Sequence, residues 1–234
     1  MKKITILSIF SILIFFNSSA QIALELGAKG SYNSTWLFNK NISDQGAEQD
    51  YAMAWGQNMG LSAAAFIGPI GVALEFYNGS HTGGYAGTVS ILGDYQSNVK
   101  LKTNHIPLLL KFRGESGGYL EIGAQYNTVS RATYTIDYTD NALFDQEKDV
   151  TPNYAKKYLS AILGFGANVK PMKELPLAVN VGVRLQYGFQ DAMGVDALGN
   201  ALNNSILYPT YEKTNAVSGG LILGVTYTVS TAKK

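Results

Sequence analysis

The chain has 234 residues, with 18 Lys and Arg against 17 Asp and Glu, so its formal net charge is +1. A nucleic-acid-binding domain normally carries a clustered basic surplus, so this near balance argues against nucleic acid as a partner. The chain has no Cys, which excludes disulfides, thiol nucleophiles and Cys-based zinc sites. Only 15% of its residues are charged, whereas soluble domains average about 25%, so we expect much of the surface to face something other than water.

Residues 1–20 have the three parts of a secretory signal peptide. Lys2 and Lys3 give a short basic start, residues 4–16 are apolar apart from one Thr and two Ser, and residues 17–20 are small. The apolar run is short for a spanning helix, which needs about 20 residues, although a retained N-terminal anchor is the alternative. We therefore predict a cleaved signal peptide at 1–20 and one exported domain at 21–234.

Apolar residues in the rest of the chain recur with a period of two, and no later segment has 18 uninterrupted apolar residues. In 177–190, for example, Val179 and Val181 lie on an apolar face, while Asn180 and Arg184 lie on a small or polar face. This pattern predicts eight strands, at 21–33, 55–67, 70–78, 97–113, 118–136, 154–170, 175–190 and 214–230.

The predicted connections alternate in length. Short turns are expected at 68–69, 114–117 and 171–174, and long polar loops at 34–54, 79–96, 137–153 and 191–213. Long loops on one rim and short turns on the other are typical of outer-membrane barrels. The sequence thus predicts an all-β fold, an eight-stranded antiparallel up-and-down transmembrane β-barrel with four long external loops and short periplasmic turns.

The strands of a water-soluble eight-stranded barrel, such as a lipocalin-type carrier, also alternate between apolar and polar residues. The composition of the two faces must therefore distinguish a water-soluble barrel from a membrane barrel. In a carrier the polar face meets water and is rich in charge, whereas here it consists mostly of Gly, Ser, Ala, Asn and Gln, which suit a narrow lumen. The apolar face carries aromatic residues close to strand ends, as in membrane girdles: Tyr32, Trp55, Tyr126, Tyr187, Phe189 and Tyr227. Both features favour the membrane barrel.

Six charged residues are in phase with the inward face of these strands: Glu25, Lys29, Glu75, Lys111, Glu121 and Arg184. Three carboxylates and three cations in a narrow lumen should pair, because an isolated buried charge is costly. We predict an ionic network that plugs the lumen, with a charged constriction in a narrow conduit as the alternative. Pro107 and a change of alternation over 103–106 predict a β-bulge, on which the phase of Lys111 depends.

Catalysis and metal binding have little support in the sequence. The only histidines are His81, in a predicted loop, and His105, near the predicted bulge, and no spacing brings a Ser, a His and an acid together. Asp145, Glu147 and Asp149 alternate as calcium ligands can, but the loop lacks the Gly and terminal Glu of an EF-hand, so a solvated acidic loop is favoured over a divalent-ion site. We predict no catalytic residue, no cofactor and no metal site.

Two segments resemble a known family. The sequence His-Ile-Pro-Leu-Leu-Leu-Lys-Phe at 105–112 and Gly-Gly-Tyr-Leu-Glu-Ile-Gly at 117–123 resemble the strand, turn and next strand of the PorT-like outer-membrane β-barrel proteins of Bacteroidota. With the signal peptide and the last strand, the resemblance covers essentially the whole chain, although its specific motif is short. It implies an outer-membrane barrel of about eight strands and supplies no catalytic residues; one branch of the family serves the gliding and secretion machinery. The chain ends in Ala-Lys-Lys, whereas many barrels end in an aromatic residue.

The expected function is structural or interaction-based, carried by the external loops of an outer-membrane barrel with a plugged lumen. The expected partners are outer-membrane lipid and, through the loops, other envelope proteins. Three alternatives remain open from the sequence: a narrow channel or transport pore, a component of an envelope secretion machinery, and an outer-membrane enzyme with its site at the rim.

Overall fold

The computed structural model describes residues 22–139, 142–171 and 175–230, so the predicted signal peptide lies outside the described residues. The elements in chain order are β1 (Ile22–Phe38), α2 (Lys40–Ser43), η1 (Gly46–Glu48), β2 (Asp50–Ala52), β3 (Ala54–Ile67), β4 (Ile70–Val89), β5 (Gly93–Arg113), β6 (Gly118–Tyr138), η2 (Ala142–Phe144), β7 (Gln146–Asp149), η3 (Thr151–Asn153), β8 (Lys157–Val169), β9 (Leu177–Gly188) and β10 (Asn215–Ser230). Helices in the described ranges are too short or too polar to cross a bilayer.

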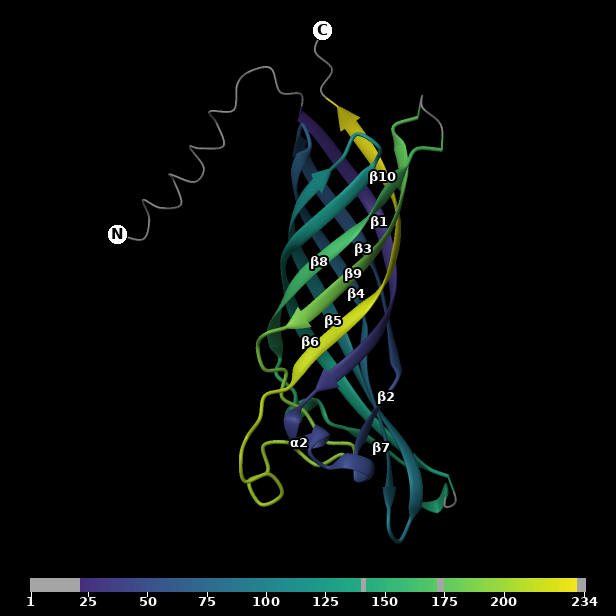
Figure 1. Ribbon diagram of the computed structural model, residues 1–234, viewed down its shortest axis with the longest axis vertical. Coiled ribbons are helices and arrows are strands. Elements are labelled where there is room, and N and C mark those ends of the chain that lie inside the picture. Colours follow the sequence, from purple (N-terminus) through teal and green to yellow (C-terminus); the bar gives the residue numbers. More distant parts are fainter. Residues whose placement is uncertain (1–21, 140–141, 172–174, 231–234) are drawn as a thin grey trace, which may run out of the picture.

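In this part of the chain, eight strands close into one antiparallel ring (Figure 1). The order around the ring is β4, β3, β1, β10, β9, β8, β6 and β5, and β5 pairs back with β4. The first and last strands of the chain, β1 and β10, pair from Ala23↔Ser230 to Phe38↔Asn215. Closure pairs the backbone of every ring strand on both sides, as a sheet in lipid requires. The predicted eight-stranded antiparallel up-and-down β-barrel is confirmed.

The outer surface of the ring is apolar over the half that carries the short turns. On β4 the outward residues are each about half exposed: Ile70 at 49%, Val72 at 51%, Leu74 at 56% and Phe76 at 51%. The inward residues between them are small or buried, including Ala73 and Glu75. All six predicted girdle aromatics lie outside, and Tyr32 stacks on Trp55 with ring centroids 5.0 Å apart. This apolar belt is the surface that a bilayer covers.

Several strands continue far beyond the apolar belt, which corrects the predicted loops. The segment 79–96, predicted as a loop, is the outer part of a β4–β5 hairpin whose ladder reaches Val89↔Gly93. Likewise β1 extends to Phe38, and β7 adds a short strand to β6 within the predicted loop 137–153. For β4, the predicted end at residue 78 lies just after Phe76, the last outward apolar residue of that strand. Outside the membrane, however, that face meets water, so the strand continues with polar residues there.

The loop end of the barrel has a hydrophobic core of its own. Its largest fully buried members come from β1, α2, β4, β5, β8 and the segment 191–213: Leu37, Ile42, Tyr85, Tyr95, Leu101, Tyr158 and Leu202. The sequence predicted solvated polar loops here. Instead, α2 and the segment 191–213, which we call the loop cap, fold over the end of the barrel, because apolar residues spaced irregularly along them cover one another.

A β-bulge interrupts the pairing of β5 with β6. Lys102 pairs with Arg131 and Thr103 pairs with Val129, which leaves Ser130 as an extra residue on β6. The sequence predicted a bulge at 103–106; the irregularity does lie beside Thr103, but the extra residue belongs to the neighbouring strand. Because of it, Ser130 and Arg131 are both exposed, although side chains elsewhere on this stretch alternate between the two faces.

Candidate functional site

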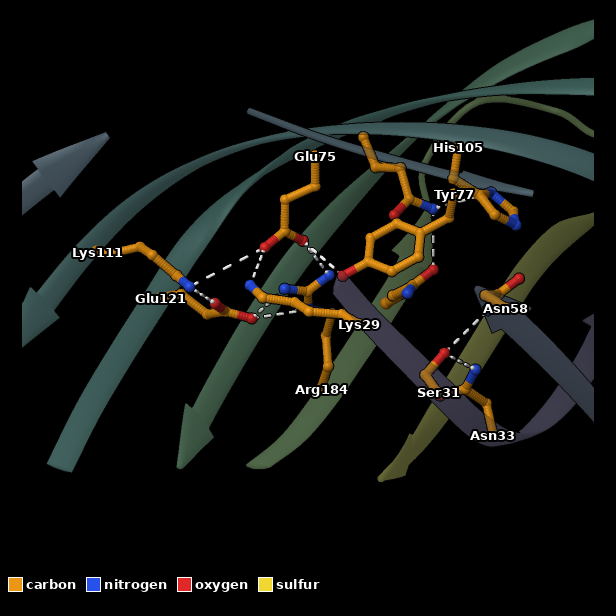
Figure 2. Close-up of polar contacts among 12 residues, drawn as sticks. Lys29, Ser31, Asn33, Asn58, Glu75, Tyr77, His105, Lys111, Glu121 and Arg184 are labelled. Atoms are coloured by element: carbon orange, nitrogen blue, oxygen red, sulfur yellow. Dashed lines mark hydrogen bonds and ion pairs between the residues drawn. The ribbon is translucent and has the colours of Figure 1, made fainter. Parts of the chain in front are cut away.

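Five charged side chains from five strands meet across the lumen (Figure 2). They are Lys29 on β1, Glu75 on β4, Lys111 on β5, Glu121 on β6 and Arg184 on β9, and we call them the lumen cluster. Lys29 forms an ion pair with Glu75. Arg184 bridges the two carboxylates, at 2.8 Å from Glu75 Oε2 and 2.6 Å from Glu121 Oε1. Lys111 Nζ lies 3.0 Å from Glu121 Oε2 and 4.0 Å from Glu75 Oε1. The cluster therefore ties opposite walls of the barrel together.

Small residues between the charged ones make room for these contacts. Gly164 on β8 is in register with Glu121 on one side and Arg184 on the other. A Cβ at Gly164 would lie 2.6 Å from Glu121 Oε1. On the far wall, Lys29 is flanked by Gly60 and Gly224 in its register. Glycines in the lumen thus allow long charged side chains to lie flat across it.

The structure places all six residues named from the sequence in the lumen, but it separates one of them. Glu25 lies nearer the short-turn end, where its Oε1 is 2.6 Å from Arg113 Nη1. The Arg113 guanidinium also stacks on Phe66, 3.8 Å from the ring centroid. Arg113 was missed by the sequence analysis, although it has the same phase as Lys111 two residues earlier.

Tyr77 was also missed. Its hydroxyl donates to Glu75 Oε2 at 3.0 Å, and the ring lies at the loop side of the cluster (Figure 2). The signal in the sequence was its phase, because Tyr77 follows Glu75 by two residues on the inward face. The aromatic residues named from the sequence are all on the apolar, lipid-facing side.

A layer of polar side chains fills the lumen next to the cluster, toward the loops. Asn127 Oδ1 accepts from Gln125 Nε2 at 2.6 Å, and Asn127 Nδ2 donates to Ser160 Oγ at 2.8 Å. His105 Nδ1 lies 2.6 Å from Asn127 Oδ1, and its Nε2 lies 2.8 Å from Thr103 Oγ1. His105 is thus held on both ring nitrogens inside a hydrogen-bonded network, as a structural residue would be.

Little space remains on the short-turn side of the cluster. The cavity bounded by Lys29, Lys111, Arg113 and Tyr119 measures about 10 Å³, which is about the room of one water molecule. A wider hollow of about 790 Å³ lies at the short-turn mouth, around Gly114. The side chains of the lumen cluster and of the neighbouring polar layer thus fill this part of the barrel interior.

The loop cap is organised around the buried carboxylate of Asp196, which is 1% exposed. Its Oδ1 accepts from the backbone N–H groups of Leu198 at 2.9 Å and Asn200 at 2.8 Å. Its Oδ2 accepts from the Tyr208 hydroxyl at 2.6 Å. Burial, with the nearby Asp196 carboxylate, raises the pKa of Tyr208 above its ordinary value, so the hydroxyl keeps its proton and donates.

The cap is also fastened to the barrel wall. The carbonyl oxygen of Ala197 accepts from Ser97 Oγ at 2.6 Å and from the Tyr134 hydroxyl at 3.0 Å. Gln49 Oε1 accepts from the Ala197 backbone N–H at 3.1 Å. These bonds join the cap to β5, β6 and the connection before β2. The external surface is therefore built on a fixed support.

His81 lies on β4 beyond the apolar belt, not in a loop as predicted. Its Nε2 donates to the carbonyl oxygen of Trp36 at 3.0 Å, and the side chain is buried. Burial lowers the pKa of His81 to about 4, so the folded protein holds it neutral. The free energy of unfolding then has a His81 contribution that is complete above about pH 6.5, where the unfolded residue is also neutral, and is lost as pH falls toward about 4.

We expect His81→Gln to flatten this pH dependence. Between pH 7 and pH 4.5 the unmodified barrel should lose about 2 kcal/mol more unfolding free energy than the variant, measured by urea titration in detergent micelles. Gln can still donate to the Trp36 carbonyl, so the two proteins should agree closely at pH 7. Parallel losses in the two proteins would show that His81 is protonated without cost in the folded state.

The described acidic residues of the segment 137–149 lie at the end of β6 and on or just before β7. Asp145 Oδ1 accepts from the Tyr138 N–H at 2.8 Å, and Asp149 Oδ1 accepts from the Thr151 N–H at 2.9 Å. Glu147 lies on β7, opposite Thr135. Residues 140 and 141 lie outside the described ranges; among the described residues, no three acidic or His side chains come together as metal ligands would.

Comparison with known proteins gives structural similarities only. No family model and no curated protein matches the chain. The match to Neisserial surface protein A covers 88% of this chain and 97% of that protein, at 13% sequence identity and a TM-score of 0.42. The match to the N-terminal β-barrel domain of Pseudomonas aeruginosa OprF covers 90% of this chain and 100% of that domain, at 14% sequence identity and a TM-score of 0.42. The match to the outer-membrane protein OprG of the same organism covers 90% of this chain and 96% of that protein, at 13% sequence identity and a TM-score of 0.42. None of these values identifies a family.

Proposed function

We propose that this protein is an outer-membrane β-barrel with a plugged lumen, which acts through its folded external surface on other components of the envelope. The observation that carries the proposal is the lumen cluster, since five charged side chains span the interior and leave a cavity of about 10 Å³ beside them. A blocked lumen leaves lipid, the short-turn mouth and the loop end as the surfaces that can work. Of these, the loop end is supported by a hydrophobic core and fixed hydrogen bonds.

The proposal includes export through a cleaved signal peptide at 1–20 and membership of the PorT-like family. The support is the three-part N-terminal pattern and the two motifs at 105–112 and 117–123. Within that family, a role in an envelope secretion machinery is the narrower form of the same proposal. A protein partner would then dock on the loop end or at the short-turn mouth.

We also propose that the protein is a binding component and not an enzyme. Both histidines are buried: His81 Nε2 is bonded to the Trp36 carbonyl, and the two ring nitrogens of His105 contact Thr103 and Asn127. A rim enzyme would need a general base within reach of solvent and substrate. If His81→Gln, which preserves the bond, abolished turnover of a lipid or peptide, this part of the proposal would be wrong.

Ion conductance of the refolded mature protein in a planar bilayer tests the plug. We expect no steady single-channel current from a barrel whose insertion is shown separately by different gel mobilities of boiled and unboiled samples. The matched comparison is Glu121→Gln, which removes one charge from the cluster while keeping its shape. Steady currents whose ion selectivity changes in Glu121→Gln would establish the alternative, a narrow channel with the cluster as its filter.

A further inference from the structure

Five basic side chains gather on the outer surface of the barrel, on β5, on β6 and at the start of β8. They are all exposed, and we call them the basic band: Lys100, Lys102, Arg131, Lys156 and Lys157. Lys102 lies opposite Arg131 in the β5–β6 pair. Lys157 is in register with Thr128 on β6, and the carbonyl oxygen of Lys156 accepts from the Val129 N–H at 3.0 Å. The five therefore lie on or next to three neighbouring strands, β5, β6 and β8.

The bulge in β6 creates part of this patch. Val129 and Ala132 point inward, at 9% and 0% exposure. With strict alternation from Val129, Ser130 would point outward and Arg131 inward. The extra residue instead turns Ser130 and Arg131 both outward, and Ser130 Oγ donates to the Lys102 carbonyl at 3.1 Å. Bulges of this kind re-aim side chains, and here the result is a guanidinium placed beside a lysine.

The band lies just beyond the lipid-facing surface on the loop side. The last outward apolar residues of β5 and β6 are Ile106 and Tyr126, at 39% and 40% exposure, and Leu159 takes that place on β8. Lys102 is four residues beyond Ile106, about 13 Å along the strand, and Lys157 is two residues beyond Leu159, about 7 Å. Tilted strands and flexible lysine stems bring these charges to the level of the lipid headgroups.

One carboxylate, that of Asp149 on β7, lies near enough to Arg131 to interact with it electrostatically, and it leaves the other four members of the band without such a partner among the described residues. Within the described ranges, none of its five members forms an ion pair, and the ion pairs that exist lie in the lumen or at the short-turn mouth. Like charges directly opposite one another, as Lys102 and Arg131 are, destabilise an antiparallel pair. Asp94 and Asp137 lie farther out, toward the tip of the β4–β5 hairpin. An external anion at the headgroup level would offset the repulsion.

We propose that the basic band binds the phosphate groups of lipids in the outer leaflet of the membrane, and so fixes the depth and rotation of the barrel. The inference rests on the proposed function, because it requires a barrel inserted with its loops outward. Arg131 can hold a phosphate with two parallel N–H bonds, while the lysines supply point charges around it. Lipids reach this surface without displacing any part of the protein.

The experiment measures binding of diphosphorylated lipid A to the refolded barrel in neutral detergent micelles, with dephosphorylated lipid A and inorganic phosphate as comparison ligands. The variant is Lys102→Gln/Arg131→Gln, and the matched control is Lys40→Gln/Lys213→Gln, which removes the same charge from exposed positions outside the band. We expect the band variant to bind diphosphorylated lipid A about twentyfold more weakly, since each basic residue near the surface contributes roughly a fivefold effect. The control should bind as the unmodified protein does.

Three results would overturn the inference while leaving the proposed function in place. They are equal binding of the phosphorylated and dephosphorylated lipids, equal weakening in the two double variants, and inorganic phosphate competing at the same concentration as the lipid. The gel-mobility assay of boiled and unboiled protein is run on every sample. A chain that never forms a heat-modifiable barrel would refute the membrane barrel itself, and the lipid site would fall with it.

Discussion

Glu75→Gln is expected to lower the free energy of unfolding of the barrel by about 3–5 kcal/mol, because it leaves buried cations without their shared partner. Glu75 is 1% exposed and faces Lys29, Lys111 and Arg184, the last at 2.8 Å. After the change, Glu121 alone would have to balance three cations. Urea unfolding of the refolded protein in micelles, followed by gel mobility and circular dichroism, measures the effect.

Two further variants separate this effect from a general cost of mutation. Glu115→Gln removes a carboxylate from the exposed turn between β5 and β6, where it makes no ion pair with any described residue, and should leave the unfolding curve unchanged. Lys29→Met/Glu75→Gln removes a cation together with the anion and should recover part of the loss. If Glu75→Gln cost under about 1 kcal/mol, the cluster would have to be hydrated, and the lumen open.

Asp196→Ala is expected to open the loop cap without unfolding the barrel. The change removes the acceptor of four hydrogen bonds, which come from the backbone N–H groups of Leu198 and Asn200, from the Asn200 side-chain amide and from the Tyr208 hydroxyl. Unsatisfied buried donors cost about 1–3 kcal/mol each, so the free energy of local opening should fall by about 3 kcal/mol or more. Hydrogen exchange across 191–213 measures it, and the exchange of β9 and β10 should stay as slow as before.

A control within the same segment is available for the cap. Glu212 contacts Asn39 only through its backbone carbonyl, so Glu212→Ala should leave the exchange of the cap unchanged. Tyr208→Phe, which removes a single donor, should give an effect of about 1 kcal/mol, between the control and Asp196→Ala. Fast exchange of 191–213 already in the unmodified protein would mean that the cap is a solvated loop.

The ring of strands and the inward phase of the charges could be read from the sequence because both depend on period two. Alternation fixes which side chains share a face, so Glu75 and Arg184 could be placed in the lumen without knowing which strands are neighbours. Their actual partners depend on register and tilt, which alternation does not encode. The pairing of Glu25 with Arg113 and not with the cluster is of this kind.

The loop end was misread for a different reason. The sequence analysis used outward apolar residues to recognise strands, a criterion that holds only where lipid is the solvent. Beyond the belt, β4 presents polar residues such as Asn78 and Ser80 to water, and its inward residue Tyr85 belongs to the hydrophobic core of the loop end. The role of Asp196 was also invisible, because it arises from contacts between residues that follow no period.

The length of the β4–β5 hairpin decides how far the protein stands out from the cell. Val89, near its tip, follows the last outward apolar residue of β4, Phe76, by thirteen residues of continuous strand, which is about 40 Å of chain and about 30 Å of height once strand tilt is included. Ile91, which is 91% exposed, lies at the tip of this hairpin. A large rigid body, such as an antibody fragment or a neighbouring cell's surface protein, can therefore touch the tip while the bilayer and its headgroups stay out of its way.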